Sequence, residues 1–515
     1  MSKKPFKSTL TVGGMTFISR IFGYVRDAII FIVFGANAGT DAFFVAFRLP
    51  NFLRRIFAEG AFSQAFIPVL TGSLNEGETQ FRRLIDHMTG VLSVILIILT
   101  VIGIVFSPVL IFIFAPGFDD PQQEILASDM LKITAPYILF ISLTALAGSI
   151  LNIRQKFAVP AFTPVLLNLS LIGASIWLAP RMQEPVTALA WGVLIAGIAQ
   201  LLFQLPFLAQ VKALPVPRLS GARAGVKRTF KLMLPAIFGS SIVQINLLID
   251  TMIASFLVAG SISWLYISDR FVELPLALFG IATATVILPM LSRQHVTGAA
   301  EQFNQTMQWA MKLSLLIAVP AMLGLIVLAG PIITTLIQYR EFSAFDTQMA
   351  SMSLVAYAFG LPAFIFIKVL APGFYSRQDT KTPVKIGVVA MLVNIALNLS
   401  FLWLWRHLQL PGAHTGLALA TSLSAYVNAT LLFLLLKRSQ VIFQLGTWIH
   451  MALKVFVSSL IMLLVLYWLI PPAATWTEWG TYIRFGYLIG FIALGTLVYA
   501  SILFFLGLRP RHIRP

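Results

Sequence analysis

Long apolar runs recur along the chain, each about twenty residues long and separated by short polar segments. A helix needs about 20 apolar residues to cross a bilayer, so each run predicts a membrane-spanning helix. The runs lack the alternating pattern of barrel strands. The pattern therefore predicts an all-α polytopic membrane protein. We expect fourteen transmembrane helices, which begin near residues 8, 40, 84, 128, 159, 186, 230, 264, 310, 347, 384, 414, 448 and 482.

Composition agrees with this class. Of the 515 residues, 58% are hydrophobic and 11% charged, and the mean hydropathy is +0.89, which excludes a soluble domain of this length. The net charge of +17 lies mainly in short loops, so it indicates topology and not nucleic-acid binding. The absence of cysteine excludes disulfides and thiolate metal sites.

Lysine and arginine are distributed unequally between the two sets of alternating loops. The richer set includes the segments at 3–7, 82–83, 154–156, 212–231 and 377–385. The opposite set holds Arg181, Arg340, Arg406 and Arg484. Basic loops stay in the cytoplasm, so we expect both termini there. The basic start, MSKKPFKSTL, lacks a small-residue cleavage site and is interpreted as leading into an uncleaved first helix.

The chain also repeats itself. LNIRQKFAVP (151–160) is similar to FYSRQDTKTP (374–383), and AFIPVL (65–70) to VILPML (286–291). An even number of helices per copy gives both copies one orientation, as in transporters built from parallel repeats. We therefore predict two parallel-repeat six-helix lobes plus two C-terminal helices. The predicted parts are an N-terminal lobe (1–210), a basic cytoplasmic linker (211–229), a C-terminal lobe (230–438), and two additional helices with a basic tail (439–515).

The first two predicted spans are unusually rich in arginine. Arg20 and Arg26 lie in the first span, where Asp27 adjoins Arg26. A charge at bilayer depth costs about 2.5–3.5 kcal/mol on insertion scales, so such side chains must face a wet cavity or reach an interface. Surplus positive charge in a cavity indicates an anionic cargo. The alternative is a structural ion pair that bridges helices.

The second span continues this pattern. It carries Asp41, Arg48, Arg54 and Arg55, and Glu59 follows. Pro50 is expected to break the helix, and half-helix ends at membrane depth are places where transporters contact anions. Arg48 and Arg54 are the candidates for cargo contact, whereas Arg55 points about 100° away from Arg54 and could reach lipid phosphate. Glu59 could cap or pair this segment.

A matching cluster lies in the second half, in SWLYISDRFVELP (263–275). Asp269, Arg270 and Glu273 fall within one helical turn, so Glu273 can reach either neighbour. An intramembrane cluster of this kind is typical of a gate that pairs when empty and opens for cargo, or of a static buried network. Guanidinium groups bind phosphate oxygens in a bidentate manner.

Asp250 is a lone acid in the seventh span. It could ligate a monovalent cation together with Asn394 and Asn398 of the eleventh span, or be a hydrogen-bonded carboxyl. No Walker A loop, GxSxG or HExxH occurs, and the six histidines lack ligand spacing. We therefore expect a transporter and no enzyme, with no cofactor beyond such a coupling cation.

Two segments resemble a known family. DAFFVAFRLPNFLRRIFAEGAFSQAFIPVL (41–70) and APGFYSRQDTKTPVKI (371–386) are similar to the MurJ/MviN family, bacterial lipid II flippases of the multidrug/oligosaccharidyl-lipid/polysaccharide (MOP) exporter superfamily. The resemblance implies an inner-membrane protein that carries undecaprenyl-pyrophosphoryl-disaccharide-pentapeptide, by alternating access, to the periplasmic leaflet. It also implies membrane lipids and cell-wall synthesis proteins as partners, and no nucleic acid.

The resemblance also assigns roles to particular residues. It implies that Ser19, Arg20, Arg26, Arg48, Arg54 and Arg270 bind substrate, with Arg270 on the pyrophosphate. It implies ion-pair or gating roles for Asp27, Asp41, Glu59, Asp269 and Glu273. In some relatives a sodium site is proposed at the seventh and eleventh helices, where Asp250 and Asn394 stand. The two last helices would shape a groove for the prenyl tail.

Other functions require other features. A cation or drug exporter of the same superfamily would need surplus acid in its cavity, and a membrane glycosyltransferase or phosphatase would need a carboxylate pair or a histidine site. A non-transporting scaffold would have lost the charge cluster. A flippase for another polyprenyl-pyrophosphate-linked oligosaccharide would use the same chemistry and stays open as an alternative.

Overall fold

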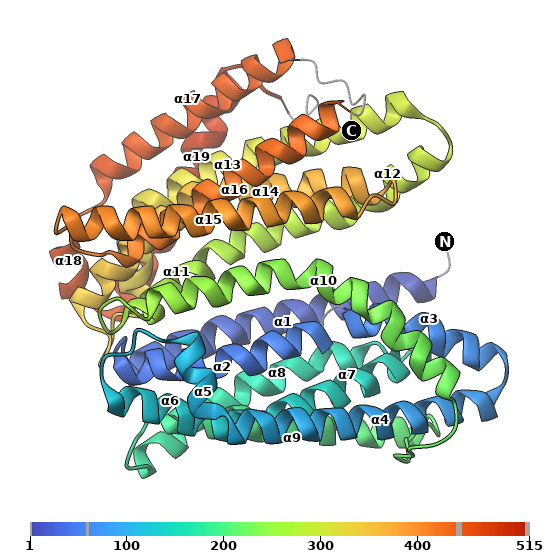
Figure 1. Ribbon diagram of the computed structural model, residues 1–515. Helices are drawn as coiled ribbons and strands as arrows, with labels where there is room; N and C mark the ends of the chain where they lie inside the picture. Colours follow the sequence, from blue (N-terminus) through green and yellow to red (C-terminus); the bar gives the residue numbers. More distant parts are fainter. Residues whose placement is uncertain (1–2, 58–60, 439–444, 510–515) are drawn as a thin grey trace. The chain divides into compact units, whose positions relative to one another are not determined.

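The computed structural model describes residues 3–57, 61–438 and 445–509, which form helices joined by short loops, with no strand among them (Figure 1). The predicted all-α fold is confirmed. The chain divides into two compact units, residues 1–260 and 261–515.

The first unit is a bundle around a core between α3, α4 and α7. Phe66, Phe81, Leu92 and Ile150 are fully buried there, because their helices place apolar side chains at positions three and four residues apart. Its elements are α1 (Lys3–Phe34), α2 (Ala38–Phe57), α3 (Ala61–Asn75), α4 (Glu78–Val105), α5 (Ser107–Phe114), α6 (Pro121–Thr134), α7 (Tyr137–Ile153), α8 (Ala158–Gly173), η1 (Ala174–Leu178), η2 (Ala179–Arg181), α9 (Thr187–Gln210) and α10 (Arg223–Ala254).

The second unit packs around α13 and α14. Met307, Val369 and Leu436 are buried in its core. Its elements are α11 (Ser261–Pro275), η3 (Leu276–Ile281), α12 (Ala282–Val296), α13 (Ala300–Leu336), α14 (Ala344–Tyr375), α15 (Lys381–His407), α16 (His414–Arg438), α17 (Leu445–Leu469), α18 (Ala473–Glu478) and α19 (Thr481–Phe505).

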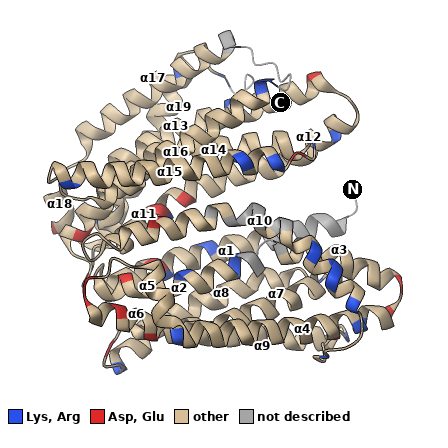
Figure 2. Cartoon of the chain, viewed as in Figure 1, with Lys and Arg blue, Asp and Glu red and all other residues tan. Residues whose placement is uncertain are grey.

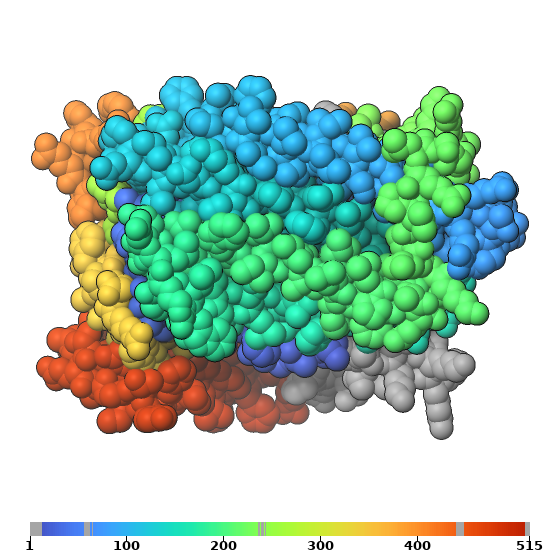
Figure 3. Space-filling model, turned by 90° about the horizontal axis from the view of Figure 1, so that it is seen from below, coloured from blue at the N-terminus to red at the C-terminus, as the bar shows by residue number. Residues whose placement is uncertain are grey.

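Eleven helices among the described residues are long and apolar enough to cross a membrane. The chain is therefore a membrane protein. The α1, α2 and α10 helices are not among those eleven, and the count of fourteen stays a prediction. Exposed apolar side chains on α4, such as Val94, Ile98 and Val101, provide the surface that lipid requires. Figure 3 shows an outer face of the first unit, covered by its light-blue to green segments.

The expected break at Pro50 is wrong. The α2 helix runs through Pro50 and ends at Phe57. Proline removes one backbone hydrogen bond, which neighbouring groups compensate in membrane helices, so a proline within a span need not end it. Arg54 is therefore presented by the last turn of a continuous helix.

The sequence repeat has a counterpart in local geometry. Gln155 follows α7 and Gln378 follows α14, and both adopt positive φ, 59° and 62°. The arginine before each stacks on a phenylalanine of its own unit: Arg154 on Phe81 and Arg377 on Phe303, each with Cζ 4.6 Å from the ring centroid. The same turn and the same cation–π contact thus occur at equivalent places in both units.

The segment between α9 and α10 is docked on α4. The Val216 amide donates to Oδ1 of Asp86 at 2.8 Å, and the Arg218 amide donates to the Asp86 carbonyl at 3.0 Å. Gly90 permits this approach, because a Cβ there would lie 2.2 Å from the Arg218 oxygen. The contacts of α10 place it in the first unit. The lobe and linker boundaries drawn from sequence stay a prediction.

Candidate functional site

Charged residues lie mostly in loops and at helix ends, but α1, α2 and α11 also carry them within their length (Figure 2). These helices hold most of the site residues predicted from sequence.

The α1 helix carries a buried ion pair. Arg26 is 9% exposed and Asp27 is 3% exposed. Arg26 donates from Nε and Nη2 to Oδ1 of Asp27, at 2.9 and 2.6 Å. Its Nη1 donates to Oδ1 of Asn168 on α8 at 3.0 Å. The amide nitrogen of Asn168 in turn donates to the Ser19 carbonyl at 3.0 Å. The guanidinium plane is thus held from two directions, by a carboxylate and by an amide.

Arg20 and Ser19 take different places on α1. Arg20 is exposed, whereas Ser19 is half-buried and contributes its carbonyl to the Asn168 contact. Arg20 and Arg26 therefore do not form one cluster, in agreement with their six-residue spacing.

Two charged residues of α2 contact the last part of the first unit. Arg48 donates from Nε to Oγ1 of Thr251 on α10 at 3.0 Å. Asp41 is 2% exposed, and its Oδ2 accepts from the Gly260 amide at 2.7 Å. These contacts hold α2 against the segment that leads out of the unit.

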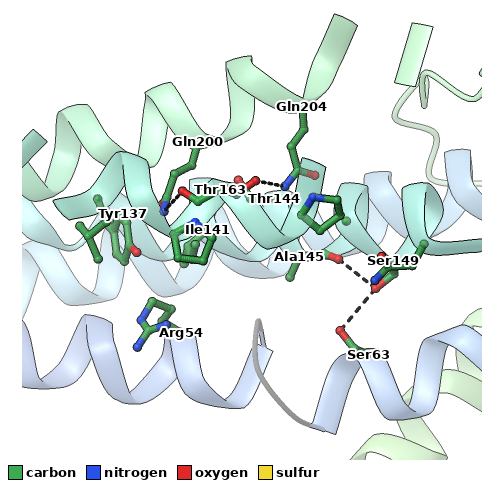
Figure 4. Close-up of a pocket in the computed structure, with 15 residues that line it drawn as sticks. Arg54, Ser63, Tyr137, Ile141, Thr144, Ala145, Ser149, Thr163, Gln200 and Gln204 are labelled. Carbon is green, nitrogen blue, oxygen red and sulfur yellow. Dashed lines mark hydrogen bonds between the residues drawn. The ribbon is translucent and has the colours of Figure 1, made fainter. Parts of the chain in front are cut away.

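Arg54 has a different hydrogen-bond partner from Arg26. Its Nε donates to Oδ1 of Asn51 at 3.0 Å, and its side chain lines a cavity between α7, α8 and α9 (Figure 4). Arg55 is half-buried, with Nε buried and without a hydrogen-bond partner among the described residues. Glu59 lies outside the described residues.

The second unit carries its own arginine centre on α11. Arg270 donates from Nη1 to Oε2 of Glu273 at 2.6 Å and from Nη2 to the Tyr266 hydroxyl at 3.0 Å. Its Cζ lies 4.9 Å from the Tyr266 ring centroid. Glu273 thus reaches Arg270, one of the two partners that its spacing allows. Asp269 is half-buried beside Arg270.

The residues of the predicted cation site lie in different units. In the first, Asn246 donates to Oδ2 of Asp250 at 3.2 Å. In the second, Asn398 donates to Oδ1 of Asn394 at 3.0 Å, and Asn394 donates to Thr421 Oγ1 at 3.3 Å. Within the described part of the chain, no group of three acidic or histidine side chains could hold a metal ion.

Sequence reasoning missed three residues of this site: Asn168, Tyr266 and Thr251. Tyr266 precedes Arg270 by four residues, and that spacing on a helix could have revealed it. Asn168 and Thr251 lie far from their partners in sequence, and no spacing signal marks them.

Comparison with known proteins places this arrangement in a family. A family model described as lipid II flippase MurJ matches residues 30–489. A probable lipid II flippase MurJ of Vibrio cholerae serotype O1 is 45% identical, over 100% of this chain and 98% of that protein. A lipid II flippase MurJ of Burkholderia cenocepacia is 41% identical over 90% of both chains.

Solved structures agree. A lipid II flippase MurJ in an inward closed conformation matches with a TM-score of 0.80 and 29% identity, over 96% of this chain and 98% of that one. An inward-facing multidrug resistance MATE family transporter of the MOP superfamily shares the fold, with a TM-score of 0.67 at 15% identity, over 81% of this chain and 93% of that one. The chain belongs to the MurJ family of lipid II flippases.

Proposed function

We propose that the protein moves lipid II from the cytoplasmic to the periplasmic leaflet of the bacterial inner membrane, with both termini in the cytoplasm. The cargo is a polyprenyl pyrophosphate that bears a disaccharide and a pentapeptide. Transport, and no covalent chemistry on the cargo, is the proposed activity. Membership of the MurJ family supports it.

The buried Arg26–Asp27 pair is the observation that supports binding of an anionic cargo. Leaving an arginine alone in a low-dielectric interior is strongly unfavourable, and a carboxylate at 2.6 Å compensates the charge of the guanidinium and orients it there. An anionic cargo supplies the same kind of partner, because two phosphates can accept several of the guanidinium's N–H donors. The proposed role of Asp27 is to balance Arg26 while no cargo is bound.

Arg270 and Glu273 repeat this arrangement in the second unit. Their ion pair is 2.6 Å long, with the side chains 25% and 39% exposed. In the proposed mechanism Arg26 and Arg270 bind the pyrophosphate while the cavity faces the cytoplasm, and outward opening weakens those contacts. Arg48 and Arg54 would bind other parts of the head. Asp250 and Asn394 would contribute to a coupling cation site. Proteins of cell-wall synthesis are proposed as partners.

A flippase for another polyprenyl-pyrophosphate-linked oligosaccharide is the second candidate. The arginines contact phosphate in both cases, so the arginine centres do not distinguish the two cargoes.

The test is complementation in cells whose own flippase can be shut off. Periplasmic accessibility of lipid II is measured for wild type, Arg26→Ala and Arg270→Ala at equal expression, with exposed Arg181→Ala as the control. We expect accessible lipid II with wild type and the control, and a loss of at least ten-fold with either site variant. Wild-type transport by Arg270→Ala would contradict the mechanism. Normal expression of wild type without any lipid II transport would favour the second candidate.

A further inference from the structure

A cavity of about 150 Å³, lined by both apolar and polar side chains, lies within the first unit between α7, α8 and α9, with α2 and α3 along its side (Figure 4). On α7 its lining extends from Tyr137 to Asn152, about 22 Å along the helix axis. An engineered cavity of similar volume in another protein holds one benzene ring, so this cavity can take one ring-sized or residue-sized group.

Two buried glutamines line the cavity from α9. Gln200 and Gln204 are 2% and 1% exposed. Gln204 Nε2 donates to Thr163 Oγ1 at 2.9 Å, and that hydroxyl donates its own proton to the Val159 carbonyl at 2.9 Å. Gln200 Nε2 donates to the Thr163 carbonyl at 3.2 Å. Thr163 thus acts as an acceptor for both amides.

This hydrogen bonding fixes the orientation of both carboxamides. A carbonyl oxygen cannot donate, and the single hydroxyl proton of Thr163 is already used, so each glutamine must direct its nitrogen to Thr163. The Oε1 atoms of Gln200 and Gln204 therefore do not bind Thr163. Both Oε1 atoms are buried, and neither has a hydrogen-bond partner among the described residues. Buried acceptors of this kind are unfavourable until a donor reaches them.

Positive charge comes from the opposite side of the cavity. Arg54 extends from α2 toward Tyr137 and Ile141 of α7, facing the wall formed by α8 and α9 (Figure 4). Among the described residues that line the cavity, Arg54 is the one charged residue. Ser63 and Ser149 add hydroxyls, with their oxygens 3.4 Å apart. The lining therefore suits a ligand with an anionic oxygen on one side and hydrogen-bond donors on the other.

We propose that this cavity is a subsite for the polar head of the cargo. An anionic oxygen of the head lies toward Arg54, and neighbouring N–H or O–H groups donate to Gln200 and Gln204. The inference rests on the proposed function and adds a recognition step separate from the pyrophosphate contacts of Arg26 and Arg270. Two parts of one cargo share this chemistry: the carboxylate end of the peptide, with its adjacent amide, and the sugar next to the phosphates, with its hydroxyls.

The test measures dissociation constants for the full-length protein in detergent with three probes. These are lipid II, the same polyprenyl-pyrophosphoryl disaccharide without its peptide, and undecaprenyl pyrophosphate alone. Gln200→Met and Gln204→Met each remove a carboxamide at similar volume, and they are made separately so that either can serve if the other does not fold. Gln210→Met, at an exposed position of α9, is the matched control. Thermal unfolding without ligand shows that each variant is folded.

We expect each cavity variant to weaken lipid II binding about five-fold, as the loss of one hydrogen bond does, and Gln210→Met to have no effect. If the variants weaken lipid II but leave the peptide-free probe unchanged, the peptide occupies the cavity. If both are weakened equally and undecaprenyl pyrophosphate is unchanged, the sugar occupies it.

Two results would overturn the inference: no change with any probe, or equal weakening of all three, since the cavity would then not recognise the head. Failure of wild type to bind lipid II at all would instead contradict the proposed function. Binding of lipid II by wild type together with unchanged binding by both variants would leave the proposed function intact and remove only the subsite.

Discussion

Arg26 and Asn168 are joined by a hydrogen bond of 3.0 Å between α1 and α8, although 142 residues separate them in sequence. Asn168 also donates to the Ser19 carbonyl, so one amide side chain holds both the guanidinium and the helix that carries it. Since Asp27 binds the other edge of the guanidinium, Asn168 is a positioning residue for Arg26.

Asn168→Ala should lower lipid II transport about ten-fold at equal expression. A hydrogen bond to a charged group contributes about 1.5–3 kcal/mol, and without it Arg26 can turn away from the cargo. Transport is measured by the periplasmic accessibility of lipid II. The control is Ser170→Ala, which removes a hydrogen bond between α8 and the Gly192 carbonyl but leaves Arg26 untouched. Equal losses of transport in the two variants would show that the effect comes from the packing of α8 and not from the orientation of Arg26.

The Tyr266 side chain makes two separate contacts with Arg270, a hydrogen bond through its hydroxyl and a cation–π contact through its ring. Tyr266→Phe removes the hydroxyl that accepts from Arg270 and keeps the ring under the guanidinium, so we expect about a five-fold fall in transport. Tyr266→Leu removes both contacts. The loss of the cation–π contact should reduce the stabilisation of Arg270 by roughly a further 0.5–2 kcal/mol and lower transport below that of the Phe variant. Tyr375→Phe, at the end of α14, is the control. Equal transport by the Phe and Leu variants would exclude a role for the ring.

Asp379 should make stability depend on pH in the acidic range. It lies in the loop before α15, where its Oδ1 accepts from the Thr382 amide at 3.0 Å. Hydrogen bonds from the side chain and then the backbone of Thr382 lower the pKa of Asp379 below 3.8. The folded pKa is thus depressed, so the stabilisation is present above about pH 4 and is lost as the pH falls through the folded pKa.

Asp379→Ala should therefore lower the free energy of unfolding by about 1 kcal/mol at pH 7, the size of a helix-capping contact, and by less at an acidic pH where the carboxyl is protonated in the folded state. Denaturant unfolding in detergent at both pH values measures this. Glu184→Ala, at an exposed loop position, is the control. A loss that is the same at both pH values would show that the carboxylate charge plays no part.

Arg484 should stabilise the C-terminal end of the second unit. It is 8% exposed and donates to the carbonyls of Trp479 and Thr477, at 2.9 and 2.8 Å, and of Thr334 and Gln338, at 3.3 and 3.4 Å. Arg484→Met leaves these oxygens without that donor, so the free energy of unfolding should fall by about 3 kcal/mol. Arg181→Met, which is exposed, should change it by less than about 0.5 kcal/mol. Comparable losses in both variants would contradict the role of Arg484.

Local patterns in the sequence predicted what depends on local geometry. Apolar runs predicted the helices, adjacency predicted the Arg26–Asp27 pair, and the three-residue spacing predicted that Glu273 can reach Arg270. The similar segments at 151–160 and 374–383 contain the matching turns after α7 and α14. Each of these signals lies within one helix or one short motif.

Contacts between distant helices could not be obtained in this way. The meeting of Arg26 with Asn168, of Arg48 with Thr251, and of Arg54 with the cavity depends on which helix faces are packed together. Helical periodicity gives the direction of a side chain relative to its own helix, but not the neighbour that it meets. Pro50 shows a related limit, because tertiary packing decides whether a proline ends a helix.

The stacking of Arg154 on Phe81 and of Arg377 on Phe303 has a mechanical consequence. In the first unit the contact fastens the end of α7 to the start of α4, and in the second it fastens the turn after α14 to the start of α13. Two helices fastened at one end separate most easily at the other. Each contact therefore restrains the separation of the two helices at this end of its unit, and we expect any bending within a unit to occur at the opposite end.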